Sequence, residues 1–310
     1  MPQPLAFVFP GQGSQHLAML AELAAEHTII QETFAEASEV LGYDLWELTQ
    51  NGPEADLNQT DRTQPALLTA GVALWRLWLQ QGGAEPAMMA GHSLGEYTAL
   101  VCSGAIEFKD AVNLVRLRGE FMQQAVPAGT GAMAAILGLD DDAIQAACAA
   151  AAGDEVVSPV NFNCPGQVVI AGNAAAVERA IEGCKEAGAK RAIPLPVSVP
   201  SHCVLMKPAA EQMAVELKNI DIKMPAIQVI QNFTAKTPAT VAELVDNLLA
   251  QLYSPVLWTD SVQNMIDQGI ECTVECGPGK VLSGLNKKVQ RTLTVVAIND
   301  PAGLEKALGA

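Results

Sequence analysis

The chain has little positive charge, few aromatic side chains and no long apolar run. Its 18 Lys and Arg residues face 34 Asp and Glu residues, for a formal net charge of −16. Because phosphate contacts need a basic surface, we expect no nucleic-acid partner. No segment approaches the roughly 20 apolar residues of a membrane span, so we expect no membrane association. Residues 1–4 also lack the basic segment and apolar core of a signal peptide.

The number and spacing of the cysteines indicate neither disulfide bonds nor a metal site. The seven cysteines are an odd number scattered along 310 residues, which is typical of reduced thiols in a cytoplasmic protein. Cys272 and Cys276 are separated by three residues and have no paired histidines nearby, so we predict no metal site there.

The remaining composition favours a globular α/β protein. Half of the residues are hydrophobic, 17% are charged and 5% are aromatic, which suits helices packed on a sheet in one large domain or two. Helix and strand patterns alternate, as in a core with a mainly parallel sheet. We predict strands at 5–9, 86–90, 227–229 and 272–274, and helices at 17–25, 30–42, 65–80, 96–101, 108–125 and 241–252.

Residues 126–201 follow a different order, β-α-β-β-α-β, which is that of a ferredoxin-like unit. This unit interrupts the α/β pattern and is predicted to be an inserted small domain at 126–202. The large domain is then discontinuous, at 1–125 and 203–310. The predicted strands are 131–138, 156–163, 167–172 and 191–197, and the helices are 140–152 and 173–188.

The segment 91–95, Gly-His-Ser-Leu-Gly, follows a predicted strand and precedes a predicted helix. This context makes the pattern a nucleophile elbow, in which two glycines permit a sharp turn that exposes the serine hydroxyl. The helix that follows directs its N-terminal N–H groups at the place where negative charge would develop. We therefore predict Ser93 as a nucleophile that forms an acyl ester. The alternative is an ordinary Gly/Ser turn.

A serine hydroxyl needs a base, and the chain has four histidines. His16 and His27 lie in the first helical region, and His92 adjoins the nucleophile, where a neighbouring side chain usually points elsewhere. His202 follows the inserted domain, and clefts form at such boundaries. We predict His202 as the base; a structural histidine in a tight turn is the alternative.

An oxyanion needs two N–H donors, one of which is the backbone of Leu94, the residue after the nucleophile. The loop 11–15 leaves the first strand, and its glycines allow close approach to a substrate. A dinucleotide fingerprint in this loop would need a glycine where His16 stands. A phosphate-binding loop would need Gly-Lys followed by Ser or Thr. The loop 11–15 has no such sequence, and Gly279-Lys280 is followed by valine.

Two arginines of the predicted helix 108–125 lie on different faces. Arg116 shares a face with polar residues and is predicted to be solvated. Arg118 falls on the apolar stripe, where a guanidinium is costly unless a carboxylate pairs with it. That carboxylate is either an internal Asp or Glu, or a substrate carboxylate such as that of a malonyl group.

Five motifs together resemble the malonyl-CoA:acyl carrier protein transacylase family of fatty-acid synthesis, over essentially the whole chain. The acyltransferase domains of polyketide synthases are similar too. The motifs are FPGQGSQ at 9–15, GHSLGE at 91–96, RLRG at 116–119, PSH at 200–202 and ECGPG at 275–279.

The resemblance implies a hydrolase-like α/β core with a ferredoxin-like insertion, and a ping-pong malonyl transfer from malonyl-CoA to an acyl carrier protein. It implies Ser93 as the nucleophile, His202 as its base and Gln251 as the residue whose backbone carbonyl orients the histidine. Oxyanion donors would be Gln12 and Leu94. Arg118 would bind the malonyl carboxylate, and Asn161 would line the cleft.

No metal or bound cofactor is implied. Because carrier proteins are acidic, docking on this acidic chain needs local positive charge; the candidates are Lys190, Arg191, Lys287, Lys288 and Arg291, although each could be ordinary solvated charge. Three alternatives stay open from the sequence: a serine esterase or thioesterase, a polyketide-type acyltransferase with another extender unit, and a non-catalytic scaffold.

Overall fold

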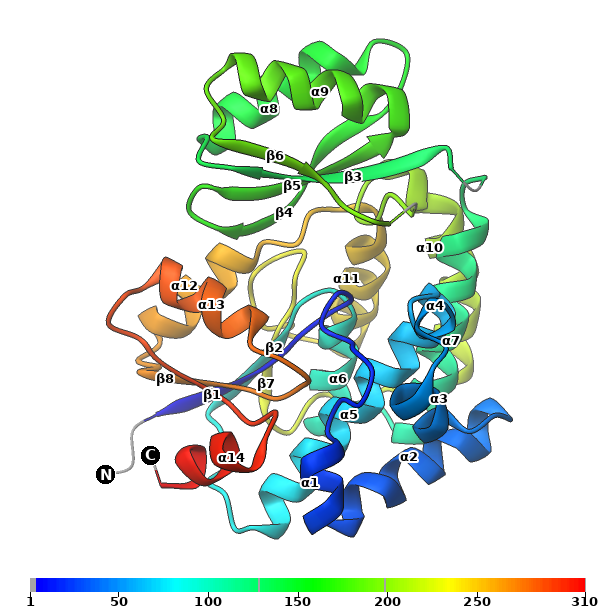
Figure 1. Ribbon diagram of the computed structural model, residues 1–310, viewed down its shortest axis with the longest axis vertical. Helices are drawn as coiled ribbons and strands as arrows, with labels where there is room; N and C mark the ends of the chain where they lie inside the picture. The colour runs from blue at the N-terminus through cyan, green and yellow to red at the C-terminus, as the bar shows by residue number, and fades with distance from the viewer. Residues whose placement is uncertain (1–3, 128, 198, 310) are drawn as a thin grey trace.

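A parallel sheet lies at the centre of the larger part of the molecule (Figure 1). The structure is a computed structural model that describes residues 4–127, 129–197 and 199–309. Within these residues the strand order is β7-β2-β1-β8-β9, and every neighbouring pair is parallel. The strands are β1 (Leu5–Phe9), β2 (Met88–Gly91), β7 (Gln228–Ile230), β8 (Cys272–Glu275) and β9 (Thr294–Ala297).

Side chains of β1 alternate between the two faces of this sheet. Phe7 and Phe9 enter one hydrophobic cluster, whereas Ala6 and Val8 enter another. Because both faces are covered, β1 is apolar at every position instead of alternating with polar residues. The first cluster receives residues from α1 (Ala21–Glu26), α2 (Thr28–Leu41), α3 (Leu45–Asn51), α4 (Glu54–Leu57), α5 (Thr60–Gln80), α6 (Leu94–Cys102), α7 (Phe108–Gln124), α10 (Lys207–Glu216), α11 (Val241–Tyr253) and α14 (Pro301–Leu308), and the second from α12 (Trp258–Asp267) and α13 (Val281–Val289).

A second, antiparallel sheet has the order β4-β5-β3-β6 among the described residues. Figure 1 shows it at the top of the molecule, with α8 and α9 on its outer face. The connectivity β-α-β-β-α-β confirms the predicted ferredoxin-like unit; the domain boundaries at 126 and 202 stay a prediction. Its elements are β3 (Gly131–Leu137), α8 (Asp141–Ala152), β4 (Val157–Cys164), β5 (Gln167–Asn173), α9 (Ala174–Glu186) and β6 (Arg191–Pro194).

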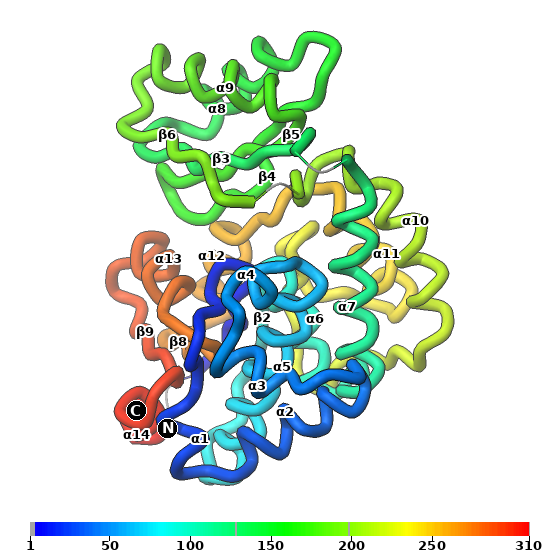
Figure 2. Tube along the Cα trace, turned by 45° about the vertical axis from the view of Figure 1, so that its right-hand side comes forward, coloured from blue at the N-terminus to red at the C-terminus, as the bar shows by residue number. Residues whose placement is uncertain are grey.

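The inner face of the second sheet packs toward the large core (Figure 2). Met133 and Val160 on this face join a cluster with Cys203, the residue after His202. Val256, after α11, exchanges backbone hydrogen bonds with Val160 and Phe162 of β4, at 2.8 and 3.0 Å. Strand β4 is thereby fixed to the segment after α11, and its Val160 packs beside the segment that carries the predicted base.

Several sequence predictions differ from the structure. Helix α1 begins at Ala21, not at 17, and α3, α4, α10, α12, α13 and α14 were not predicted. Helix α5 begins at Thr60, not at 65, and Pro65 lies inside it; the proline leaves the Asp61 carbonyl without its helical N–H partner but does not end the helix. Strand β6 ends at Pro194 instead of 197, since Pro194 and Pro196 have no N–H to extend the ladder. Strand β9 was not predicted; its four residues form the edge of the parallel sheet.

Candidate active site

Ser93 stands at the sharp turn between β2 and α6, in a backbone conformation that side chains rarely adopt (φ 52°, ψ −109°). A Cβ at Gly91 would lie 1.8 Å from the carbonyl carbon of Gly95, and one at Gly95 would lie 2.0 Å from the Phe9 carbonyl oxygen. Both positions therefore require glycine. The elbow that the sequence predicts is present, and it is braced by a hydrogen bond from the Ser93 N–H to Asn232 Oδ1 (2.6 Å).

His202 lies against the serine, with Nε2 2.8 Å from Ser93 Oγ. Its Nδ1 lies 2.7 Å from the Gln251 carbonyl oxygen. A carbonyl only accepts, so Nδ1 carries the proton and Nε2 is left to accept from the serine hydroxyl. The structure thus brings Ser93, His202 and Gln251 together as the sequence predicts.

The imidazole of His202 is held in its neutral form. Burial, and then the positive charge of Arg118, lower the pKa of His202 to about 3, against the raising effect of its bond to the Gln251 carbonyl. His202 is only 3% exposed. A neutral imidazole that touches a hydroxyl is the arrangement of a general base with its nucleophile.

The two expected oxyanion donors come from neighbouring strands. Leu94 is the first residue of α6, so its N–H has no acceptor within the helix. Gln12 follows β1, which pairs with β2, and both Gln12 and Leu94 line the same cavity as Ser93. Because parallel strands end at one edge of the sheet, the loop after β1 and the elbow meet there.

Arg118 is buried behind the serine at 1% exposure. Its Nη1 donates to Gln64 Oε1 (2.7 Å), and its Nη2 donates to Gln251 Oε1 (3.0 Å) and Ser93 Oγ (3.3 Å). Among the described residues, Arg118 belongs to none of the ion pairs, and its Nε has no hydrogen-bond partner. Of the two partners considered for this guanidinium, an internal carboxylate therefore makes no direct contact with it.

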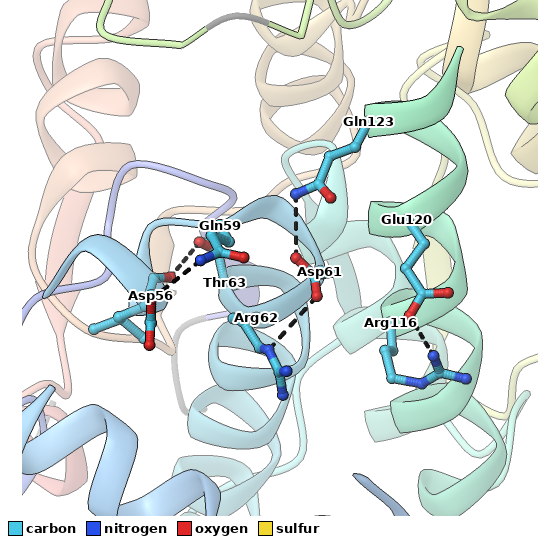
Figure 3. A network of polar contacts seen from close by, with 9 residues as sticks. Asp56, Gln59, Asp61, Arg62, Thr63, Arg116, Glu120 and Gln123 are labelled. Atoms are coloured by element: carbon cyan, nitrogen blue, oxygen red, sulfur yellow. Dashed lines mark hydrogen bonds and ion pairs between the residues drawn. The ribbon is translucent and has the colours of Figure 1, made fainter. Parts of the chain in front are cut away.

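Arg118 lies on α7, and the surface-exposed face of that helix carries polar contacts of its own, as Figure 3 shows. Arg116 pairs with Glu120 one turn along and also donates to Asn113 Oδ1 (2.9 Å), so it is engaged at the surface as predicted. Gln123 donates to Asp61 Oδ1 (3.1 Å) at the start of α5. This bond ties α7 to α5 at the edge of the cavity, which Gln123 also lines.

A cavity of about 520 Å³ opens in front of Ser93, between the two sheets. Asn161 of β4 lines it, and the Asn161 Oδ1 is buried without a hydrogen-bond partner among the described residues. His92 also lines it, but its Nε2 bonds to Asn163 Oδ1 (2.8 Å) and is directed away from the nucleophile. The remaining lining is mostly apolar: Met122, Val126, Pro127, Met133, Leu195, Pro196, Val197 and Val199.

The five basic residues considered for docking are all exposed. Three of them, Lys190, Arg191 and Lys288, lie near the end of the second sheet at which β3 ends. Arg191 and Gln167 both pair with Leu137, from opposite sides. Lys288 Nζ bonds to Gln167 Oε1 (3.2 Å), which places the end of α13 at this same edge. Lys287 differs, because its Nζ bonds to the Leu293 carbonyl of its own loop (2.8 Å).

Sequence reasoning missed the polar residues behind the site: Gln64, Glu96, Gln231 and Asn232. Each is fully or almost fully buried and hydrogen-bonded. Only Glu96 left a signal in the sequence, since Ser93 and Glu96 have the spacing of a helix capping box. The described residues contain no cluster of three or more His, Cys, Asp or Glu side chains able to hold a metal ion. None of the helices in the described ranges is long and apolar enough to cross a membrane.

Comparison with known proteins agrees with this geometry. The acyl transferase domain family matches residues 6–301. The malonyl CoA-acyl carrier protein transacylase of Salmonella typhimurium is 63% identical over 303 residues, 98% of each chain. An acyl carrier protein S-malonyltransferase from Vibrio cholerae is 62% identical, with a TM-score of 0.96 over 98% of this chain and 99% of that one.

A second solved structure is a type II polyketide-synthase acyl carrier protein in complex with its malonyl-transacylase. The transacylase in this complex is 56% identical to the present chain, with a TM-score of 0.98 over 99% of each chain. With the elbow, the serine–histidine pair and the matched length taken together, the chain belongs to the acyl transferase domain family.

Proposed function

We propose that this protein transfers a malonyl group from malonyl-CoA to the phosphopantetheine thiol of an acyl carrier protein, through an acyl-serine intermediate. The observation that carries the proposal is a serine–histidine pair at 2.8 Å beside a buried arginine that has only neutral partners. The names of the similar proteins support the same substrate and acceptor.

In the first half-reaction, Ser93 Oγ attacks the thioester carbonyl carbon while His202 Nε2 takes the hydroxyl proton. The carbonyl oxygen becomes an oxyanion that accepts from the N–H groups of Leu94 and Gln12. When the carbonyl re-forms, the C–S bond breaks and the thiolate of CoA takes the proton from His202. Gln251 keeps the imidazole in the required tautomer through its backbone carbonyl.

The second half-reaction runs the same steps in reverse order. The carrier-protein thiol gives its proton to His202 and attacks the ester carbonyl, and Ser93 leaves with that proton. Arg118 holds the malonyl carboxylate, and Asn161 offers its unpartnered amide oxygen to the substrate in the cavity. The scheme moves only protons and an acyl group, so we propose neither a metal nor a bound cofactor for it.

The decisive experiment is intact-protein mass spectrometry after exposure to malonyl-CoA, followed by peptide mapping. We expect an adduct of malonyl mass on Ser93, stable in buffer and discharged rapidly by a carrier protein. Rapid discharge to water without the acceptor would instead indicate an esterase or thioesterase. Preferred loading from methylmalonyl-CoA would indicate a polyketide-type extender unit.

The depressed pKa of His202 predicts an unusual pH profile. An imidazole of ordinary pKa, near 6.5, would be about tenfold less available as a base at about pH 5.5. With its pKa lowered to about 3, His202 stays neutral there. We expect kcat/KM for acetyl-CoA loading to change less than about twofold between pH 8 and about pH 5; acetyl-CoA is chosen because its acyl group cannot engage Arg118.

Unfolding measurements at each pH provide the control for this profile. The folded pKa of His202 lies below its unfolded value, so His202 lowers the free energy of unfolding as pH falls below about 6.5. Burial raises the folded pKa of Glu96 to about 7, so Glu96 has the opposite effect between its ordinary value and about 7. These two effects offset each other between about pH 5 and about pH 6.5. A tenfold loss of acetyl loading near pH 5.5 in folded protein would contradict the shift.

We propose that the carrier protein docks at the basic edge formed by Lys190, Arg191, Lys287, Lys288 and Arg291. The bond between Lys288 and Gln167 supports one shared surface instead of two separate patches. Leu137 at this edge is four residue steps along β3 from Met133 at the cavity, about 13 Å along the strand. Three exposed acidic residues, Asp140 to Asp142, lie beside Gly166 at the same edge.

Charges of opposite sign at one edge give the docking proposal a two-sided test. Lys288→Glu together with Arg191→Glu should lower kcat/KM for the carrier protein about tenfold or more at low salt, while malonyl loading from CoA stays within twofold. Asp142→Asn should raise kcat/KM for the carrier protein. An equal fall of both half-reactions in the reversed variant would refute this docking edge.

The reaction is proposed to take place in the cytoplasm. All seven cysteines lie within the described residues as free, buried thiols, which supports a reducing compartment.

A further inference from the structure

Glu96 is a buried carboxylate beside the site that the chemistry above does not use. It is 0% exposed and lies in the first turn of α6. Three donors meet it: Gln231 Nε2 at 3.0 Å on Oε1, and the Asn232 N–H at 2.8 Å and Gln251 Nε2 at 2.9 Å on Oε2. A carboxylate with no ion pair needs such donors to remain inside a protein.

The spacing of Ser93 and Glu96 would normally cap the helix. In a capping box the serine hydroxyl accepts from the backbone N–H of the glutamate, and the glutamate accepts from that of the serine. Here the Ser93 side chain makes no capping bond, and its hydroxyl contacts His202 instead. The Ser93 N–H goes to Asn232 Oδ1, so the Glu96 carboxylate is free to face Gln251.

The contact with Glu96 fixes which way the Gln251 amide points. Gln251 Nε2 donates to Glu96 Oε2 (2.9 Å) and to the Ser93 carbonyl (3.0 Å), which uses both of its protons. Its Oε1 is left to accept from Arg118 Nη2 (3.0 Å). The reversed amide would place an oxygen against two acceptors and an NH₂ group against a guanidinium, so Glu96 selects the observed orientation.

This arrangement matters for Arg118. The guanidinium is held by two neutral amide oxygens, from Gln64 and Gln251, and Glu96 acts on it only from behind Gln251. A direct ion pair would occupy the groups that an incoming carboxylate needs. Glu96 lies behind Gln251 and does not contact Arg118 directly. It can therefore orient the guanidinium through the Gln251 amide and leave it available to a substrate carboxylate.

We propose that Glu96 is a positioning residue that sets malonyl selectivity by orienting Arg118 through the Gln251 amide. The proposal rests on the proposed function, because it assumes that Arg118 receives an acyl carboxylate. Burial raises the pKa of Glu96 to about 7, against the lowering effects of its three hydrogen bonds and of Arg118. The tests are therefore set at about pH 8, where the carboxylate is ionised.

The readout is the ratio of kcat/KM for malonyl-CoA loading to that for acetyl-CoA loading, measured as acyl adduct on Ser93. In Glu96→Ala the Gln251 amide loses the acceptor that fixes it, and we expect the ratio to fall about tenfold or more. A folded Glu96→Ala protein with an unchanged ratio, or with equal loss for both acyl groups, overturns the proposal.

Two further variants keep the test decisive. If Glu96→Ala does not fold, Glu96→Asp retains a buried carboxylate but withdraws it by about 1.5 Å from Gln251, and the same fall in ratio is expected; an unchanged ratio overturns the proposal. Glu96→Gln can present its one carbonyl oxygen where Asn232 and Gln251 donate, so its ratio should stay within about threefold of wild type. A tenfold fall in Glu96→Gln also counts against the proposal.

Glu275 offers a matched control. It is the other fully buried glutamate among the described residues, and it accepts from the backbone N–H groups of Leu282 and Ser283 at the start of α13. Glu275→Ala should lower the melting temperature without changing the ratio. Wild-type protein that forms no malonyl adduct would refute the proposed function itself, and that outcome is separate from any result at Glu96.

Discussion

Ser93→Ala is expected to abolish the malonyl adduct and to slow malonyl transfer to carrier protein by about 10⁴-fold or more. The variant keeps the cavity, Arg118 and the expected oxyanion donors but removes the atom that would carry the acyl group. Stopped-flow or quench measurements of the transfer rate, with mass spectrometry of the protein, check this. Removal of a nucleophile is among the most costly single changes in enzymes that act through a covalent intermediate.

Ser103→Ala is the matched control for this experiment. Ser103 is also a buried serine, at the opposite end of α6, where its hydroxyl donates to the Leu100 carbonyl at 3.2 Å. Transfer by this variant should remain within about twofold of wild type. An adduct that persists in Ser93→Ala would place the nucleophile elsewhere in the chain.

Arg118→Ala is expected to slow loading from malonyl-CoA far more than loading from acetyl-CoA. The guanidinium is buried, so its contact with a malonyl carboxylate would be worth far more than a surface ion pair, and its loss should lower kcat/KM for malonyl loading about 10²- to 10³-fold. Acetyl loading lacks this contact and should change less than about tenfold. Adduct formation from each CoA ester, followed by mass spectrometry, measures both.

Arg116 supplies the control on the same helix. It is paired with Glu120 at the surface and has no contact with the cavity, so Arg116→Ala should leave both loading rates within about twofold. Arg118→Ala also leaves Gln64 and Gln251 without a donor, so its melting temperature is to be compared with wild type. An equal loss for malonyl and acetyl in folded Arg118→Ala would mean that Arg118 is structural.

Much of the fold follows from local sequence. The apolar run at 5–9 ends at Pro-Gly, and the small sheet follows from short strand and helix patterns separated by turn residues; both are short-range signals. Strand β9 has only four residues, too few for a periodicity that would distinguish it from a loop. It exists as a strand because β8 offers a parallel partner, and a single sequence does not reveal such pairing.

The site divides in the same way. Ser93, Leu94 and Arg118 belong to local patterns, a turn and an amphipathic helix, so spacing alone identifies them. The residues that hold them come from far away: Gln64 bonds to Arg118 across 54 positions, Asn232 to Ser93 across 139 and Gln251 to Glu96 across 155. No local pattern encodes those contacts, because they exist only after the sheet has assembled.

The two residues proposed to react share one costly feature. Ser93 and His202 both have positive φ, at 52° and 65°, in a region that glycine occupies freely and other residues occupy at a cost of about 1–3 kcal/mol. A directed-evolution screen that selects for thermal stability alone should therefore enrich glycine at position 93, where little side-chain volume is lost. Variants selected in this way would lack the nucleophile and would be inactive. Engineering a more stable form of this protein therefore requires selection for catalytic activity in every round.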